Sequence, residues 1–139
     1  MDKPVLIVLV GLPGSGKSTF CQKEEYKAYV RISQDEQGKL QHMMMFEDAL
    51  EARRNIIIDR CNFNVDQRKR YLKPGKEEGY HTIIIWFRRD SKTCIDRINQ
   101  RKDHPNLAAG NEKIESVVKM FEGMFVAPSD TEADEIWYL

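Results

Sequence analysis

The chain has 139 residues, of which 41% are hydrophobic and 32% charged, a composition typical of a soluble globular protein that excludes a disordered tail. Its 22 Lys and Arg residues balance 22 Asp and Glu residues, which excludes a strongly basic architectural nucleic-acid binder. The charge is nevertheless uneven, because residues 53–102 hold 14 basic against 6 acidic side chains while both flanking segments are acidic. The middle segment is therefore a candidate surface for a polyanion.

The sequence predicts an intracellular protein, cytoplasmic or nuclear, with no membrane partner. The apolar run at residues 5–10 is too short to span a bilayer, and no signal peptide precedes it. Cys21, Cys61 and Cys94 lie far apart and form no CxxC pair, which favours a reducing compartment over a disulfide framework or a zinc site. The oligomeric state stays open.

Short apolar runs alternate with longer mixed segments, which is typical of βα units on a parallel sheet. In chain order, strands are predicted at residues 5–10, 28–32, 55–59, 81–87 and 135–139. Helices are predicted at residues 17–27, from 33 or 35 to 53, at 64–72 with an end at the Pro-Gly pair 74–75, from 90 or 91 to 101, and at 114–125. The length and the lack of a linker predict one domain over residues 1–139.

Residues 11–18, GLPGSGKS, fit the phosphate-loop motif G-x-x-x-x-G-K-[ST] between a predicted strand and a predicted helix. Glycines let successive backbone N–H groups turn toward phosphate oxygens. In this motif Lys17 reaches the β- and γ-phosphates and Ser18 holds Mg²⁺. The alternative, a glycine-rich turn without a ligand, is disfavoured because motif and context agree. The predicted nucleotide contacts are Gly14, Ser15, Gly16, Lys17, Ser18 and Thr19, with ATP or another nucleoside triphosphate and Mg²⁺ as cofactors.

Two aspartates follow predicted strands, at the edge where ligands of an open parallel sheet bind. Asp35 could act as a general base toward an attacking hydroxyl, or could equally cap the next helix. Asp59 ends the third predicted strand, where a carboxylate commonly lies near the Mg²⁺ shell; the alternative is an ordinary turn residue. The residues alone leave the role of Asp35 open and make Ser18 and Asp59 candidate metal ligands.

Arg97 and Arg101 are four residues apart and share one face of a predicted helix. Arginines late in the chain of a small phosphotransferase often form a lid that stabilises charge on the transferred phosphoryl group. The alternative is a surface helix with paired charges. A second basic helix has the same ambiguity, since it could bind a polyanion or be a solvated face; its basic residues are Arg68, Lys69, Arg70, Lys73 and Lys76.

Four motifs in order resemble those of the 5′-hydroxyl polynucleotide kinases, in particular the kinase domain of animal polynucleotide kinase/phosphatase. They are the phosphate loop with residues 11–20, SQDEQG at 33–38 in the place of N-R-D-x-x-G, IIDRCN at 57–62 in the place of I-D-x-T-N, and RINQR at 97–101 in the place of R-x-N-x-R. The similarity extends from about residue 4 to the C-terminus. The chain departs from this pattern at Gln34, Arg60 and Cys61. At the position of Arg60 the family has a smaller residue.

This resemblance implies transfer of the γ-phosphate of ATP to the 5′-hydroxyl end of DNA or RNA. It implies that Asp35 is the general base, and that Lys17, Mg²⁺ and the lid arginines Arg97 and Arg101 stabilise the transferred group. The catalytic residues are then expected to be Lys17, Asp35 and Arg101. The implied architecture is an α/β P-loop NTPase-type three-layer fold with a central parallel sheet of about five strands and a small lid around residues 97–110.

Two other functions remain open. One is a P-loop kinase that acts on a small molecule, since such enzymes share the phosphate loop, an acid after the second strand and a lid. The other is a nucleotide-binding module that transfers no phosphate. The substitution Asp35→Asn separates a kinase from such a module, because only a kinase should lose transfer while it retains nucleotide affinity.

Overall fold

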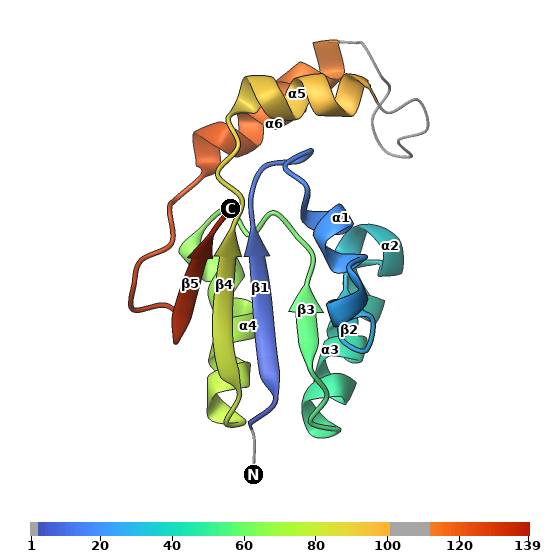
Figure 1. Cartoon of the computed structure of the whole chain (residues 1–139), viewed down its shortest axis with the longest axis vertical. Coiled ribbons are helices and arrows are strands. Elements are labelled where there is room, and N and C mark those ends of the chain that lie inside the picture. The colour runs from blue at the N-terminus through green and yellow to red at the C-terminus, as the bar shows by residue number, and fades with distance from the viewer. Residues whose placement is uncertain (1–2, 101–111) are drawn as a thin grey trace.

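A five-stranded parallel sheet forms the centre of the computed structural model, which describes residues 3–100 and 112–139 (Figure 1). The strands are β1 (Val5–Val10), β2 (Val30–Ile32), β3 (Ile56–Ile58), β4 (His81–Trp86) and β5 (Glu135–Tyr138). They lie in the order β2-β3-β1-β4-β5, and every neighbouring pair is parallel. The predicted α/β fold with a parallel sheet of about five strands is confirmed.

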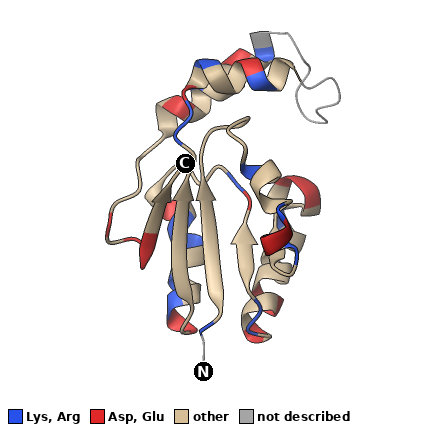
Figure 2. Cartoon of the chain, in the orientation of Figure 1, with Lys and Arg blue, Asp and Glu red and all other residues tan. Residues whose placement is uncertain are grey.

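The strands at the centre of the sheet are apolar, and nearly all side chains of β1 and β3 are buried. β1 pairs with β3 on one side and with β4 on the other. Lys, Arg, Asp and Glu are absent from β1, β3 and β4 and concentrate on the helices and connections (Figure 2). Because all five strands run the same way, their carboxyl ends meet at one edge of the sheet, where a ligand site is expected.

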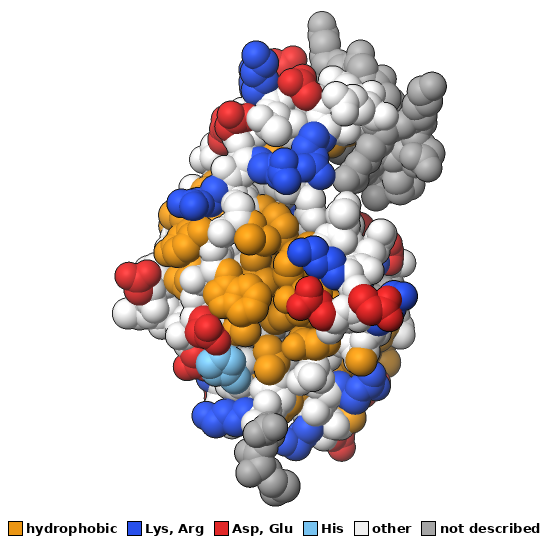
Figure 3. All heavy atoms as spheres, in the orientation of Figure 1, with side chains coloured by type: hydrophobic (Ala, Val, Ile, Leu, Met, Phe, Trp, Pro, Cys, Tyr) orange, Lys and Arg blue, Asp and Glu red, His pale blue; other side chains and the backbone are white. Residues whose placement is uncertain are grey.

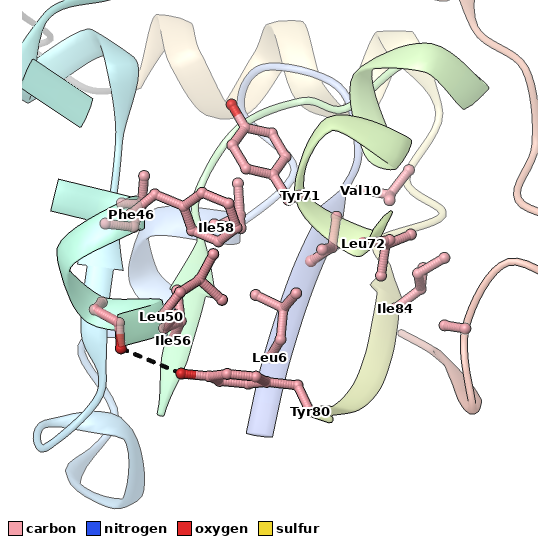
Figure 4. Close-up of a cluster of buried hydrophobic side chains, with 14 residues drawn as sticks. Leu6, Val10, Phe46, Leu50, Ile56, Ile58, Tyr71, Leu72, Tyr80 and Ile84 are labelled. Carbon is pink, nitrogen blue, oxygen red and sulfur yellow. Dashed lines mark hydrogen bonds between the residues drawn. The ribbon is translucent and has the colours of Figure 1, made fainter. Parts of the chain in front are cut away.

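Helices cover both faces of the sheet and its carboxyl edge. They are α1 (Lys17–Cys21), the 3-10 turn η1 (Glu24–Tyr26), α2 (Gln34–Gln37), α3 (Lys39–Glu51), α4 (Val65–Glu77), α5 (Ser91–Asn99) and α6 (Glu112–Met124). On one face, Phe46 and Leu50 of α3 and Tyr71 and Leu72 of α4 pack against side chains such as Leu6 (Figure 4). The opposite face is packed by residues of α1 and η1. The three-layer arrangement is therefore confirmed.

The face packed by α1 and η1 is only partly covered. In Figure 1 no described helix lies in front of β1 and β4, and Figure 3 shows hydrophobic side chains gathered on this side of the sheet. Trp137 of β5 is 38% exposed. The described residues contain no helix that is both long and apolar enough to cross a membrane.

Helices α5 and α6 lie side by side beyond the carboxyl ends of the strands (Figure 1). A buried apolar cluster joins them to the phosphate loop through Leu12, Cys94, Ile98, Ile114 and Val118. The Asp90 carboxylate caps α5 by accepting a hydrogen bond from the Thr93 N–H at 2.7 Å. The predicted lid around residues 97–110 begins in the last turn of α5, and its remaining residues lie outside the described part of the chain.

Two predicted helices are divided. The helix expected at residues 17–27 ends at Cys21 and is followed by η1, in which Tyr26 turns inward so that its ring packs 4.7 Å from that of Phe20. The helix expected to run to residue 53 breaks at Gly38, whose φ of +87° interrupts the helical backbone between α2 and α3. The second strand begins at Val30 rather than at residue 28.

The fourth helix is longer than predicted. The Pro-Gly pair was expected to end it, yet α4 continues through Pro74 and Gly75 to Glu77. Gly75 is buried against β1, where a Cβ atom would lie 2.5 Å from Leu6 Cδ2. The absence of a side chain at Gly75 therefore lets α4 pack closely against β1, and the helix continues past this residue.

Candidate functional site

The phosphate loop connects β1 to α1 at the carboxyl edge of the sheet. Gly14 and Gly16 have φ values of +82° and +107°, in the left-handed region that disfavours side chains. A Cβ atom at Gly14 would also lie 2.7 Å from the Cys94 carbonyl oxygen. The loop therefore lies between a strand and a helix, as the sequence motif predicts. Phosphate contacts by Gly14, Ser15, Gly16 and Thr19 remain a prediction.

Lys17 lies inside the loop rather than in solvent. Its ammonium group donates hydrogen bonds to the carbonyl oxygens of Gly11 at 2.9 Å and Leu12 at 2.8 Å, and it lies 3.4 Å from Ser15 Oγ. The residue is buried, so this positive charge is held at the centre of the curled backbone. Phosphate oxygens that enter the loop would meet an ammonium group already in place.

Ser18 and Asp59, the two predicted metal ligands, lie together. The Ser18 hydroxyl donates to Asp59 Oδ2 at 3.1 Å. The same oxygen accepts hydrogen bonds from Arg31 Nε at 2.9 Å and Arg31 Nη2 at 2.6 Å, and Arg31 Nη1 pairs with Glu36 at 2.6 Å. The sequence analysis missed Arg31, whose only signal was a charged residue inside a predicted strand.

The donor set suits Mg²⁺ bound to a nucleotide. A hydroxyl and a carboxylate are oxygen ligands of the kind Mg²⁺ prefers, and the remaining positions commonly belong to phosphate oxygens and water. No group of three or more His, Cys, Asp or Glu side chains in the described part of the chain could hold a metal ion alone. Ser18 and Asp59 therefore fit a metal that arrives with the phosphates, once Arg31 gives up the shared carboxylate oxygen.

Asp35 lies in the first turn of α2, with its side chain exposed beyond the end of β2. The N-cap position of this helix belongs to Ser33, so the alternative of Asp35 as a helix cap is wrong. Burial is the main cause that raises the pKa of the Cys61 thiol; the charge on Lys17 opposes it, while the charges on Asp35 and Asp59 add to it. The role of Asp35 as a general base remains a prediction.

Arg97 of α5 lies over the phosphate loop. Its guanidinium nitrogens are 3.5 and 3.9 Å from the point where a Cβ atom at Gly16 would stand. Arg97 therefore lies close to the loop, and its contact with phosphates remains a prediction. Arg101, predicted as its partner and as a catalytic residue, lies outside the described residues.

The segment that follows β3 is tied to the loop. Asn62 has a φ of +50° and donates from Nδ2 to the Leu9 carbonyl oxygen at 2.6 Å, while the Gly11 N–H donates to the Cys61 carbonyl at 3.1 Å. Asn62 is fully buried. These bonds fix the segment that carries Asp59 against the segment that carries Lys17.

Arg68 belongs to the core rather than to a basic surface. It is fully buried, its Nε donates to Glu132 Oε1 at 2.7 Å, and its Nη1 donates to the Asn62 carbonyl at 2.9 Å. Both alternatives for this residue, a polyanion surface and a solvated face, are therefore wrong. Lys69, Arg70, Lys73 and Lys76 of the same helix are exposed.

An open cavity of about 180 Å³ adjoins the phosphate loop. It lies between the loop, the end of β4 and α6, and its lining includes Leu12, Phe87, Arg88 and Glu122. Space for the rest of a phosphate-bearing ligand therefore exists beside the loop.

The family model described as AAA domain matches residues 6–124 of this chain. The chain belongs to this family. Transcription factor bHLH140 of Arabidopsis thaliana is 32% identical over 130 residues, which cover 86% of this chain and 14% of that protein. The bifunctional polynucleotide phosphatase/kinase of Schizosaccharomyces pombe is 31% identical over 74 residues, which cover 52% of this chain and 18% of that protein. The chain thus spans less than a fifth of the length of either relative.

Solved structures of kinases share the fold. A fungal RNA kinase matches with a TM-score of 0.72 at 17% identity, over 100% of this chain and 38% of that chain. A gluconokinase from Sinorhizobium meliloti 1021 matches with a TM-score of 0.66 at 14% identity, over 100% of this chain and 83% of that chain. The predicted relationship to P-loop polynucleotide kinases is confirmed by the sequence relatives; the solved structures show the fold alone.

Proposed function

We propose that this chain is an ATP-dependent kinase that transfers the γ-phosphate of ATP to the 5′-hydroxyl end of DNA or RNA. The observation that carries the proposal is the convergence of Lys17, the Ser18–Asp59 pair and Arg97 on the phosphate loop. Asp35 follows β2, the neighbour in the sheet of the strand that precedes Asp59. A sequence relative named polynucleotide phosphatase/kinase supports the choice of acceptor. An intracellular location, with a 5′-hydroxyl polynucleotide as partner, is part of the same proposal.

In this proposal the loop binds the triphosphate and holds it still. Lys17 binds the β- and γ-phosphates, and backbone N–H groups around Gly14 and Gly16 bind phosphate oxygens. Ser18 and Asp59 hold Mg²⁺, which when bound neutralises charge on the phosphate oxygens. Catalysis of this class is mostly positioning and electrostatic stabilisation, and these residues supply both.

The transfer step requires an acceptor hydroxyl in line with the γ-phosphorus. Asp35 orients this hydroxyl and accepts its proton as the acceptor oxygen bonds to phosphorus, while the bond to the bridging oxygen of ADP breaks. Arg97 stabilises the charge on the equatorial oxygens. The proton moves to a carboxylate oxygen of Asp35, and ADP leaves.

The test is transfer of radiolabelled γ-phosphate from ATP with Mg²⁺ to 5′-hydroxyl oligonucleotides, both DNA and RNA, single-stranded and nicked. Asp35→Asn should lower kcat about 10²–10⁴-fold, the range for loss of a general base, and leave ATP affinity nearly unchanged. Lys17→Ala should abolish both transfer and tight ATP binding.

Two results would refute the proposal in different ways. Labelled product that persists in Asp35→Asn would remove the general base from the mechanism. No product from any oligonucleotide, despite ATP binding by the folded protein, would favour a small-molecule acceptor. A gluconate or nucleoside panel would then be the next measurement.

A further inference from the structure

Arg31 bridges two carboxylates that come from different parts of the chain. Its Nε and Nη2 groups donate to Asp59 Oδ2 at 2.9 and 2.6 Å, and its Nη1 group pairs with Glu36 Oε2 at 2.6 Å. Asp59 follows β3, whereas Glu36 lies in α2, the four-residue helix that carries Asp35. One guanidinium therefore connects a predicted metal ligand with the helix of the proposed base.

The two ends of this bridge lie in different surroundings. The side chain of Asp59 is 4% exposed, that of Arg31 is 31% exposed and that of Glu36 is 61% exposed. Opposite charges attract each other more strongly where they are buried, because water screens an exposed pair. Arg31 is therefore held mainly by Asp59, and Glu36 is its weaker, exposed partner.

The contact between Arg31 and Asp59 takes the place of a metal ion. Asp59 Oδ2 accepts three hydrogen bonds, two from Arg31 and one from the Ser18 hydroxyl at 3.1 Å. The lone pairs of this oxygen are thus directed at N–H and O–H groups. Binding of Mg²⁺ by Ser18 and Asp59 therefore requires that Arg31 first moves away from Asp59.

Glu36 gives the displaced guanidinium a second carboxylate. A half-buried charge that loses its partner is costly, so Arg31 needs a counter-charge once Asp59 binds a metal. Glu36 Oε2 already lies 2.6 Å from Arg31 Nη1. Arg31 therefore has a counter-charge on its exposed side before it leaves Asp59, and this lowers the cost of the exchange.

Helix α2 depends on β2 for its position. All four of its residues are polar and are exposed or half-buried, so polar contacts rather than the core anchor it. Gln37 fastens the helix to β2, since its Nε2 donates to the Arg31 carbonyl oxygen at 2.9 Å and its Oε1 accepts from the Ser33 N–H at 3.1 Å. The ion pair of Arg31 with Glu36 adds a further attachment. The position of α2 is therefore sensitive to where this guanidinium lies.

We propose that Arg31 and Glu36 are positioning residues that form a latch between the metal site and α2. Arg31 holds Asp59 before a nucleotide binds, and it passes to Glu36 when Asp59 binds Mg²⁺ together with the nucleotide. Because such coupling is reciprocal, a change that favours the pair with Glu36 also favours metal binding at Asp59. This inference rests on the metal and nucleotide binding in the proposed function, and it requires no phosphate transfer.

Calorimetry of ADP binding tests the latch. The ratio of the Kd for ADP in EDTA to the Kd in saturating Mg²⁺ measures how much the metal contributes to binding. Glu36→Gln should lower this ratio about 2–5-fold, because Arg31 then loses the carboxylate to which it passes. Arg31→Met should raise the ratio, because Asp59 is then available to the metal.

A double variant and a matched control separate the latch from a general effect of charge. In the Arg31→Met background, Glu36→Gln should leave the ratio unchanged, since its effect passes through Arg31. Glu24→Gln is the control, because Glu24 is also an exposed glutamate, ion-paired with Lys27 at 2.7 Å; it should not change the ratio. A loss of equal size in both backgrounds, or no loss with Arg31 present, would overturn the latch.

Nuclear magnetic resonance follows the movement of Arg31 directly. Its Nε–H signal, assigned by its absence in Arg31→Met, should exchange slowly with water in the free protein and in ADP with EDTA, because Nε donates to the buried Asp59 carboxylate. Addition of ADP with Mg²⁺ should shift this signal and speed its exchange. A signal that ADP with Mg²⁺ leaves unchanged would overturn the inference.

The latch and the proposed function fail in different ways. A wild type that shows the predicted ratios yet phosphorylates no acceptor would support the latch and remove only the proposed transfer. Transfer to an oligonucleotide, together with equal ratios in the wild type and Glu36→Gln, would remove only the latch. A wild type that does not bind ADP would overturn both.

Discussion

The substitution Gly14→Ala tests how closely α5 rests on the phosphate loop, and Gly79→Ala is its control. Both glycines have positive φ values, +82° and +78°. A Cβ atom at Gly14 would lie 2.7 Å from the Cys94 carbonyl oxygen and 2.8 Å from Ile98 Cγ1. At Gly79 its nearest neighbour would be the flexible end of Arg53, 3.9 Å away. Both variants therefore strain the backbone, but only at Gly14 does the new methyl group come too close to packed neighbouring atoms.

The expected magnitudes follow from these two contributions. A side chain in the left-handed region costs about 1–2 kcal/mol, and this applies to both variants. Crowding against packed neighbours adds about 1–3 kcal/mol, and this applies to Gly14 alone. We therefore expect losses in the free energy of unfolding of about 1–2 kcal/mol for Gly79→Ala and about 2–5 kcal/mol for Gly14→Ala.

Urea unfolding followed by circular dichroism measures both losses. Because relief of the crowding moves α5 outward, Gly14→Ala should also draw Arg97 away from Gly16 and weaken ATP binding, whereas Gly79→Ala should not. If the two variants lose the same stability, or if Gly14→Ala binds ATP as tightly as the wild type, then α5 does not rest on the loop as described.

Three other predictions concern charges and thiols. Burial raises the pKa of Glu132, but its hydrogen bonds, first among them the one from Arg68, lower it overall below the ordinary value of 4.5. The free energy of unfolding should therefore fall as the pH drops below about 4.5. Urea unfolding at neutral and acid pH should show that this fall is smaller in Arg68→Met than in the wild type. Arg31→Met frees the Asp59 oxygen, so the Mg²⁺ concentration for half-maximal ATP binding should fall about 3–10-fold; an unchanged value in a Mg²⁺ titration would show that Arg31 does not compete. Burial raises the pKa of Cys21 to about 12 and also raises the pKa of Cys61 and Cys94. Ellman's reagent at mildly alkaline pH should therefore label none of the three thiols until urea unfolds the protein. Rapid labelling of the folded protein would contradict this prediction.

The sheet and the phosphate loop could be predicted because each depends on local sequence. Six apolar residues in a row at β1 need a site buried on both faces, and Gly14 and Gly16 have backbone angles that few other residues adopt. Asp35 and Asp59 could be placed at the ligand edge for the same reason, since each follows a parallel strand. Local pattern and fold rules thus locate the site.

The partners inside the site could not be predicted, because they are far apart in the sequence. Arg31 reaches Asp59 across 28 positions, and Arg68 reaches Glu132 across 64. Helical periodicity shows a charged face at Arg68 but contains no information about a carboxylate that arrives from another segment. The division of the predicted second helix at Gly38 was missed because the possible caps Ser33 and Asp35 and the apolar residues from Leu40 onward were read as one helix.

The contact between α5 and the phosphate loop also affects the entropy of binding. An arginine side chain has about 2 kcal/mol of rotamer entropy that a binding event can consume. Gly14 fits directly against α5, and Arg97 stands within 4 Å of a Cβ position at Gly16, so part of that freedom is lost when the chain folds. If Arg97 contacts the nucleotide as proposed, the nucleotide meets an arginine that is already ordered, and the affinity gained there comes from attraction between charges with a smaller loss of side-chain entropy.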